Sequence, residues 1–257
     1  MPRINVKDKR KQELIDANIS SIAKRGLTET TIAHVSQGAG MSRGIVNFYF
    51  TTKESMMQET CQYLADEYAG VWQRAAEKLA KGASAEDALE AVVRGHFQAS
   101  VCNQKKLSVW VAFWGHASSQ AAYRKIIDAY DVAFERHLCE LWEKAAKKRG
   151  LALSAETFAY ELHALIRGSW LSFLLSAKTA DRDVLAEKCL NYLRRCLMVA
   201  VNDAPALVKA PVVLEAVASV EVQDNVTVLA GEKARKKAAT TAAEESAAVG
   251  DLFALNG

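Results

Sequence analysis

The chain has 257 residues, of which half are hydrophobic and a quarter are charged, a composition typical of a globular protein with a substantial core. The N-terminus is charged, and no stretch approaches the roughly 18 apolar residues of a membrane span, so we expect neither a signal peptide nor a membrane partner. Five cysteines without a CxxC pair, two of them seven residues apart on one expected helix, predict free thiols in a reducing cytoplasm.

Proline usage points to an all-α protein. The only prolines are Pro2, Pro205 and Pro211, so no residue between 3 and 204 must break a helix for want of a backbone N–H. Runs of β-branched residues are scarce in the same region. We therefore predict an all-α fold.

The first 50 residues predict three short helices after a basic arm at residues 1–11. An apolar stripe at helical spacing runs over 8–25 and ends at Gly26. Thr30-Thr31 offers an N-cap for a second helix, which Gly40 breaks. Ser42 then caps a third helix that extends to about Tyr49.

The remaining helices are longer and form the body of the protein. A fourth helix begins at Thr51 or Thr52, continues to about Leu79, and is followed by helices expected at 84–103, 105–117, 120–149, 154–177 and 181–202. Segments 154–177 and 184–201 are apolar on more than one side. A helix of that kind must be buried all round, which in a small bundle indicates a partner subunit and a twofold homodimer.

The chain divides into three expected parts. Residues 1–55 form a head of three short helices with its basic arm, and residues 56–202 form a helical bundle that we expect to dimerise. Residues 203–257 hold both remaining prolines, many Ala and Val, and no sustained period. We expect that segment to be a tail of low order, with at most one short strand or helix around 212–230.

The third helix carries an unusual polar face. Val46 and Phe50 are four apart and can face inward, which leaves Arg43 and Asn47 on the opposite face. Arg reads guanine bidentately and Asn reads adenine, and Gly44 beside them lets backbone approach closely. The alternative is an ordinary exposed polar face.

Residues flanking this helix have suitable chemistry for DNA phosphates. Thr31 opens the preceding helix, where free N–H groups favour an anion, and Tyr49 and Lys53 can bind backbone phosphates. Residues 1–55 carry nine Lys or Arg and five Asp or Glu, while the whole chain has a net charge of only +3. A basic end on a near-neutral body suggests a polyanionic partner or a solvated terminus.

The segment TTIAHVSQGAGMSRGIVNFYFTTKESM resembles the helix-turn-helix of TetR-family repressors. The family pattern is a Thr-opened helix, Ala-Gly-Val/Met-Ser, a short helix ending in Tyr-Phe, and Lys-Asp/Glu. Asn47 and Phe48 depart from its commonest form, which has Tyr and His there, so the operator sequence is not given. The resemblance implies operator contacts from Thr31, Ser42, Arg43, Gly44, Asn47, Phe48, Tyr49 and Lys53.

The body resembles the BetI-type repressors, which respond to choline and control its conversion to glycine betaine. The resemblance is carried by LSVWVAFWGHASSQAAYRKIIDAYDVAFERHL at 107–138, by ALIRGSWLSFLLS at 164–176, and by the recognition-helix start Ser42-Arg43-Gly44-Ile45. It implies a choline-like inducer bound within each subunit.

Aromatic residues in the body are candidates for that site. Trp110 and Trp114 share a helix face, and Trp170 begins a second set at the same spacing. They are consistent with core, with a subunit interface, or with walls for an organic cation held by cation–π attraction. Phe97, Phe113 and Phe173 are alternate walls, and Asp128, Tyr130 and Asp131 offer charge or a hydroxyl.

The sequence gives little support for enzyme, cofactor or metal chemistry. It contains no GxxxxGK or HExxH, and its five histidines do not stand at ligand spacing. Its one GxSxG match, at residues 40–44, lies in the turn between two expected short helices. The hypothesis is a cytoplasmic, homodimeric repressor, neither enzyme nor metalloprotein, that a small ligand releases from double-stranded operator DNA. The alternatives are a regulator with an uncharged apolar inducer, and a helical scaffold whose basic arm meets acidic protein or lipid.

Overall fold

The computed structural model describes residues 6–77, 79, 82–151, 153–176 and 181–198, and every regular element in these ranges is an α-helix. The predicted all-α class is confirmed for this part of the chain. The expected tail at 203–257, its short element at 212–230, and the first residues of the basic arm lie outside the described residues. Within the described ranges, no helix has the length and hydropathy needed to cross a membrane.

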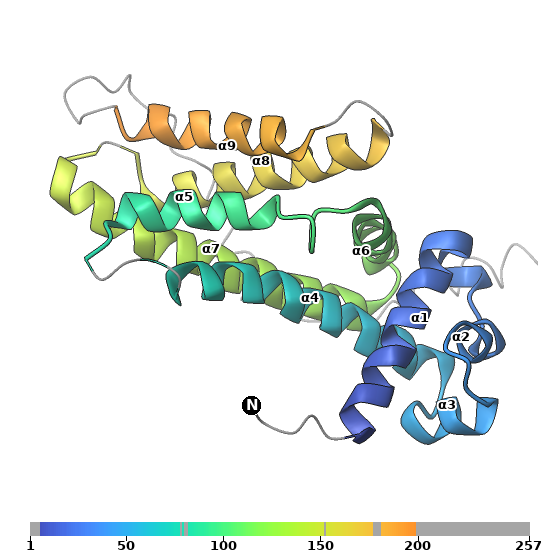
Figure 1. Cartoon of the computed structure of the whole chain (residues 1–257). Coiled ribbons are helices and arrows are strands. Elements are labelled where there is room, and N and C mark those ends of the chain that lie inside the picture. The colour runs from blue at the N-terminus through green and yellow to red at the C-terminus, as the bar shows by residue number, and fades with distance from the viewer. Residues whose placement is uncertain (1–5, 78, 80–81, 152, 177–180, 199–257) are drawn as a thin grey trace, which may run out of the picture. The chain divides into compact units, whose positions relative to one another are not determined.

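Three helices form the head: α1 (Val6–Glu29), α2 (Ile32–Gly38) and α3 (Arg43–Tyr49), and they gather at the start of α4 (Lys53–Glu77) in Figure 1. The predicted caps of α2 and α3 are present. Thr31 Oγ1 accepts from the His34 amide at 3.2 Å, and Ser42 Oγ accepts from the Ile45 amide at 3.3 Å. Gly40 joins the two helices with a φ of 63°, a conformation that favours glycine.

Helix α1 is broken at the predicted residue. Gly26 has a φ of 82° and a ψ of 170°, and a last short helical stretch follows it. The buried Thr30 hydroxyl donates to the Gly26 carbonyl at 2.9 Å and lies 3.2 Å from the Ser21 hydroxyl. These bonds fix the angle at which α1 leads into α2.

A buried hydrogen bond attaches the head to α4. The Asn18 amide Nδ2 donates to Thr60 Oγ1 at 2.8 Å, and both side chains are fully buried. Val46 and Phe50 turn inward, as predicted, and join the same hydrophobic core as Leu14 of α1. Helix α3 therefore has one face fixed by packing and the other exposed to solvent.

The body contains α5 (Ala85–His96), α6 (Gln104–Ala117), α7 (Ala121–Arg149), α8 (Ala155–Leu175) and α9 (Arg182–Cys196). Two predicted helix ends are wrong: the helix expected at 84–103 ends at His96, and the helix expected at 181–202 ends at Cys196. Asn103 explains the first of these. Its side chain donates to the carbonyls of Ala99 and Ser100 and accepts from the Lys106 amide, so it closes a turn and starts α6.

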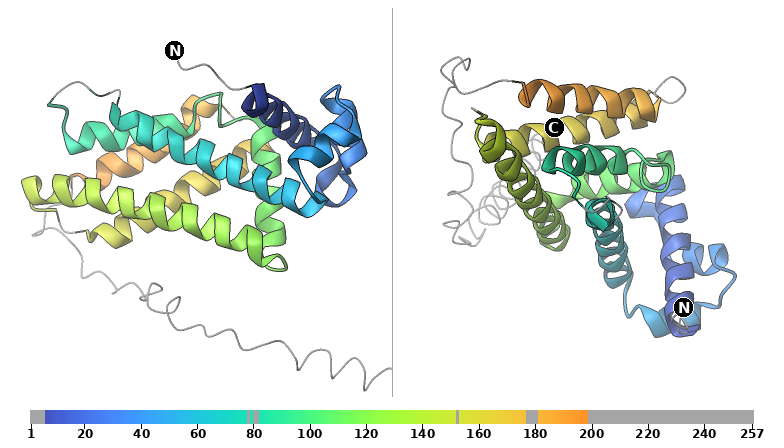
Figure 2. Two further views of the ribbon diagram at one scale, coloured as in Figure 1. Left: turned by 90° about the horizontal axis from the view of Figure 1, so that it is seen from below. Right: turned by 60° about the vertical axis from the view of Figure 1, so that its left-hand side comes forward.

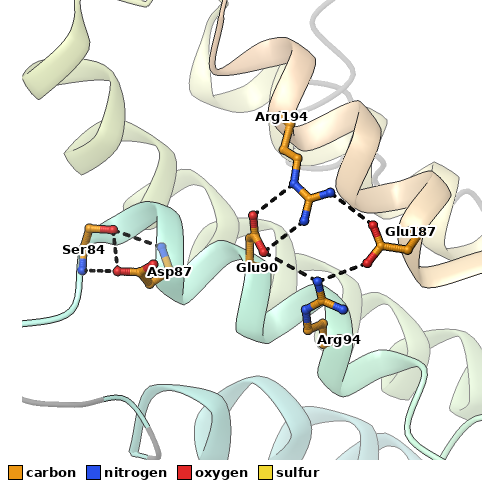
Figure 3. Close-up of polar contacts among 6 residues, drawn as sticks. All are labelled: Ser84, Asp87, Glu90, Arg94, Glu187 and Arg194. Atoms are coloured by element: carbon orange, nitrogen blue, oxygen red, sulfur yellow. Dashed lines mark hydrogen bonds and ion pairs between the residues drawn. The ribbon is translucent and has the colours of Figure 1, made fainter. Parts of the chain in front are cut away.

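Helices α8 and α9 lie side by side, and α9 also packs on α5 (Figures 1 and 2). The α5–α9 contact carries an ion-pair network, drawn in Figure 3 beside the α5 capping box. Arg194 bridges Glu90 and Glu187, and Arg94 reaches the same Glu187 at 3.0 Å. These side chains are open to solvent, so the pairs contribute little to stability and chiefly set the register of the two helices.

Candidate nucleic-acid interface and aromatic core

Helix α3 presents the predicted polar face to solvent. Arg43, Gly44 and Asn47 are exposed, and a Cβ added at Gly44 would meet no atom closer than 3.7 Å, that of Ser42 Oγ. The Phe48 side chain is 73% exposed, a high fraction for an aromatic ring. This face combines donors for base edges with an apolar surface suited to a thymine methyl group.

The flanking candidates divide between capping, packing and solvent contact. Thr31 and Ser42 are exposed, and both already cap a helix. The Tyr49 ring is half-buried and packs edge-on against Phe48 at 5.2 Å. Lys53 Nζ donates to the Thr28 carbonyl at 2.6 Å, so this lysine also ties the start of α4 to the end of α1.

Lys7 borders the same face, although the sequence pattern did not single it out as a site residue. Its ammonium lies 5.8 Å above the centroid of the Phe48 ring. A cation–π contact at this distance is weakly attractive in water, about 0.5–1 kcal/mol. The start of α1 therefore adds positive charge next to the exposed side of α3.

The three candidate tryptophans lie together in the body around a residue that the sequence did not single out. Tyr68 of α4 lies 5.5 Å from Trp110 and 5.0 Å from Trp170, ring centroid to ring centroid. Trp114 packs edge-on against Trp110 at 6.2 Å. Tyr130 closes the group from α7, with its ring 5.9 Å from Trp110.

The candidate phenylalanines have other neighbours. Phe113 is buried but packs edge-on against Tyr123 at 5.0 Å. Phe97 is buried where α5 ends, and Phe173 is half-buried, with its backbone carbonyl accepting from Gln104. Spacing grouped Phe113 and Phe173 with the tryptophans, whereas α4 and α7 supply Tyr68 and Tyr130 to the cluster.

Several polar atoms in the aromatic cluster have no hydrogen-bond partner within the part of the chain that the structure describes. They are the indole N–H groups of Trp110 and Trp114 and the hydroxyl of Tyr68. The third indole, that of Trp170, donates to the His96 carbonyl at 3.0 Å. An unpaired buried donor costs about 1–3 kcal/mol, which native proteins more often tolerate at functional sites than in plain core.

An ionic cluster borders the tryptophans between α7 and α8. Asp131 pairs with Arg167, and His163 Nδ1 lies 2.8 Å from Glu135 Oε1. Burial raises the pKa of Asp131 against the opposing effect of Arg167. The sequence flagged Asp131 but missed its partners; Asp128, flagged with it, is exposed to solvent.

A surface hollow of about 410 Å³ lies elsewhere, where the α4–α5 connection meets α7. Its lining includes Ser84, Lys144 and Lys148, and none of the candidate aromatic residues contributes to it. The tryptophan cluster is therefore distinct from this open depression.

In the part of the chain that the structure describes, the cysteines and histidines form neither a reactive thiol nor a metal site. All five cysteines are free thiols, and burial raises the pKa of Cys61 and of Cys102 to about 12. No group of three His, Cys, Asp or Glu side chains among the described residues is arranged to hold a metal ion.

Two family models match the chain. Residues 14–60 match the model of bacterial regulatory proteins of the tetR family, and residues 85–198 match that of the BetI-type transcriptional repressor C-terminal domain. Among curated proteins, the HTH-type transcriptional regulator BetI of Escherichia coli (strain K12 / DH10B) is 29% identical over 182 residues. That match covers 71% of this chain and 91% of the relative.

Solved structures show the same fold. A transcriptional regulator from Pseudomonas aeruginosa PAO1 superposes with a TM-score of 0.66 and 22% identity, covering 76% of this chain and 93% of that one. A transcriptional regulator from Saccharomonospora viridis in complex with choline gives a TM-score of 0.62 and 17% identity. It covers 72% of this chain and 96% of the other.

Proposed function

The chain belongs to the TetR family of transcriptional regulators, which are not enzymes, and has a BetI-type C-terminal domain; on that premise we propose that a quaternary ammonium, choline first, releases it from its operator. The observation that carries the DNA-binding part is the exposed face of α3, with Arg43 and Asn47 free above a buried Val46. We retain the division into a head at 1–55 and a bundle at 56–202.

The proposed docking places α3 in the major groove. Arg43 and Asn47 reach base edges, Phe48 contacts a thymine methyl, and the exposed surface at Gly44 lets the helix sit close to the DNA. Thr31, Ser42, Tyr49 and Lys53 surround this face and contact phosphates, which position the head without reading sequence. A scaffold protein would need no such arrangement around one seven-residue helix.

The proposed dimer uses the outer face of α8. Tyr160, Leu171 and Leu175 are 64%, 40% and 73% exposed, and they lie on one stripe with Ala164 and Gly168 between them. Small residues in the middle of an apolar stripe let a second helix approach closely, and a twofold interface is self-complementary. A second copy of this chain is the partner that we propose for this stripe.

Sedimentation of a Leu171→Glu, Leu175→Glu variant tests the interface. The two introduced carboxylates would be buried in the apolar contact without a partner, so we expect the variant to be monomeric. It should also lose operator binding, because the two heads are no longer held about 34–36 Å apart. Val132→Glu is the matched control, since Val132 is 46% exposed on α7, and it should stay dimeric. A dimeric double variant would remove α8 from the interface.

The proposed inducer site is the tryptophan cluster. A quaternary ammonium cannot donate an N–H hydrogen bond, so a site must hold it with aromatic faces and a carboxylate. Trp110, Trp114 and Trp170 offer the faces, and Asp131 is the nearby acid. The choline complex of the Saccharomonospora viridis regulator supports this choice of ligand.

Helix α6 carries two of these tryptophans and also contacts the head. Lys105 Nζ donates to Ser20 Oγ of α1 at 3.3 Å, and Lys106 Nζ lies 2.5 Å from Glu67 Oε1 of α4. A ligand that shifts α6 therefore acts on α1, which belongs to the head, and on α4, against which the head packs. Release follows if the ligand binds better to the arrangement that does not fit successive grooves.

Calorimetry with choline and with its uncharged isostere 3,3-dimethylbutanol tests the inducer, alongside operator release. We expect micromolar-to-millimolar choline affinity, since two or three cation–π contacts of up to about 2 kcal/mol each remain after ordering costs. Equal responses to both compounds would favour an uncharged apolar inducer. If the protein binds its operator but responds to neither compound, choline is not the inducer, and only the function as a TetR-type regulator is retained.

A further inference from the structure

Four ionisable side chains form two facing pairs between α7 and α8. Asp131 and Glu135 lie four residues apart on α7, and His163 and Arg167 lie four apart on α8. Asp131 Oδ1 contacts the Arg167 guanidinium and lies 3.7 Å from His163 Nε2. The imidazole of His163 is buried, with a side-chain exposure of 3%, and the other three side chains of the cluster are partly buried.

The guanidinium of Arg167 also lies against a tryptophan. Its central carbon is 5.4 Å from the centroid of the Trp114 ring, within the distance of a cation–π contact. One internal cation thus occupies both the aromatic face and the carboxylate that a quaternary ammonium needs. The same two groups cannot hold a ligand cation while Arg167 stays in place.

The internal pair leaves polar groups unsatisfied. Asp131 Oδ1 contacts the Arg167 guanidinium at Nη2, but Arg167 Nε and the indole N–H of Trp114 have no hydrogen-bond partner among the described residues. Burial raises the pKa of Asp131, an effect that outweighs the lowering by Arg167. Because the carboxylate is partly desolvated and the guanidinium keeps an unsatisfied N–H, this pair recovers only part of its desolvation cost, and another cation that meets the same carboxylate can replace Arg167.

We propose that the space between Trp114 and Asp131 is an organic-cation site that the chain fills with its own Arg167, and that a cationic inducer binds by displacing this side chain. The proposal deepens the proposed function, on which it rests for the inducer. The Arg167 side chain is 34% exposed, so it has a path to solvent. It stands four residues before Leu171 on the exposed stripe of α8, so its displacement reaches the proposed dimer face.

Chemical rescue of an Arg167→Ala variant tests the site without using the inducer. Ethylguanidinium replaces the missing end of the side chain, and we expect it to raise the melting temperature of this variant while leaving wild type unchanged. Neutral ethylurea has nearly the same shape and should give no shift. The Asp131→Asn, Arg167→Ala double variant should lose the rescue, and Arg136→Ala, at an exposed position on α7, should never show it.

Two rescue results would overturn the proposal. One is an equal shift with ethylurea, which would mean that the pocket takes any small planar molecule. The other is no shift from ethylguanidinium in a folded variant. If Arg167→Ala does not fold, Arg167→Gln takes its place in the same comparison, with Arg167→Lys as the variant that keeps the charge and needs no rescue.

Calorimetry with choline then tests displacement. Arg167→Gln removes the competing charge, so we expect choline to bind it about tenfold more tightly than wild type, with 3,3-dimethylbutanol unchanged. Equal or weaker choline binding by Arg167→Gln would overturn displacement. A second result would also overturn displacement: wild type binds glycine betaine more tightly than choline, and Arg167→Gln loses this preference. Arg167 would then be a direct contact to the carboxylate of the ligand.

The two experiments separate this inference from the proposed function. Rescue by ethylguanidinium in a protein that never binds choline supports the cation site and removes choline as inducer. Choline-dependent release of the operator without any rescue keeps the proposed function and overturns the Arg167 site.

Discussion

The reading head and the aromatic core use their large side chains in opposite ways. On α3, Phe48 is exposed beside Arg43 and Asn47, and the buried half of the helix consists of Val46 and the adjoining Phe50. In the core, Trp110 and Trp170 are almost completely buried and contact other rings. The surface that we propose for DNA is complete only when its partner arrives, whereas the core that we propose for the ligand must also hold the protein together without it.

The first prediction sets the two regions against each other by deleting one ring from each. Trp110→Ala removes a fully buried indole, so we expect a loss of about 3–5 kcal/mol of unfolding free energy. Phe48→Ala should change stability by less than about 0.5 kcal/mol, because its ring is mostly exposed. Urea unfolding of both full-length variants measures the difference.

Operator binding supplies the second half of that comparison. Phe48→Ala should weaken operator binding while Trp110→Ala, under conditions where it is folded, should keep the preferred sequence. Similar stability losses in the two variants would mean that the ring of Phe48 is buried in solution.

The second prediction concerns His96, a buried histidine in the core. Burial lowers its pKa to about 4, and the side chain lies 2.8 Å from the Val92 carbonyl and 3.4 Å from the Tyr130 hydroxyl. Below pH 6.5 the His96 side chain takes up a proton in the unfolded chain but not in the folded one. The contribution of His96 to the unfolding free energy is therefore fully present above that pH. It should fall by about 3 kcal/mol as the pH drops from 6.5 to 4.

Unfolding of His96→Gln at pH 7 and at pH 5 isolates this contribution. The variant should lose stability at pH 7, yet show a smaller fall on acidification than wild type. His116→Gln is the control, because His116 is exposed on α6. An unchanged pH dependence in His96→Gln would show that other groups govern the acid response.

The head was predictable because its signals are local. The caps Thr31 and Ser42, the turn at Gly40 and the inward pair Val46 and Phe50 all act within a few residues, and each was found where spacing placed it. The helix expected at 84–103 was too long because Asn103 closes a turn with carbonyls just before it. Periodicity does not register such side-chain bonds.

The core was predictable only in part because its contacts join distant segments. Spacing related Trp110 to Trp114 on α6, but nothing local relates either of them to Tyr68 or to Arg167. It also grouped Phe113 with the tryptophans, although that ring packs on Tyr123. Helix packing decides which rings come into contact, and the sequence of one helix carries almost no information about its packing partners.

The third prediction returns to the head and to base reading. Arg43→Ala should weaken operator binding by about 1–3 kcal/mol and relax the preference at one base position, as loss of a bidentate contact does. Stability should hardly change, since Arg43 is exposed. Binding to a library of operator variants measures both effects, and an unchanged preferred sequence would reassign the face of α3 that meets DNA.

The smallest expected effect, and the one that divides a DNA contact from a structural one most finely, is that of Lys53→Ala. The ammonium donates to the Thr28 carbonyl at 2.6 Å, so it helps to hold α4 against α1. An ammonium has three donors, and a phosphate can take another while the Thr28 bond remains. Loss of a phosphate contact should weaken binding to all sequences alike, by about 1 kcal/mol or less, and reduce the slope of log affinity against log salt by about one.

Loss of the Thr28 bond alone would lower stability and leave that slope unchanged. The salt titration therefore decides whether Lys53 meets DNA or only fastens the head, which base preference cannot do because neither role reads sequence.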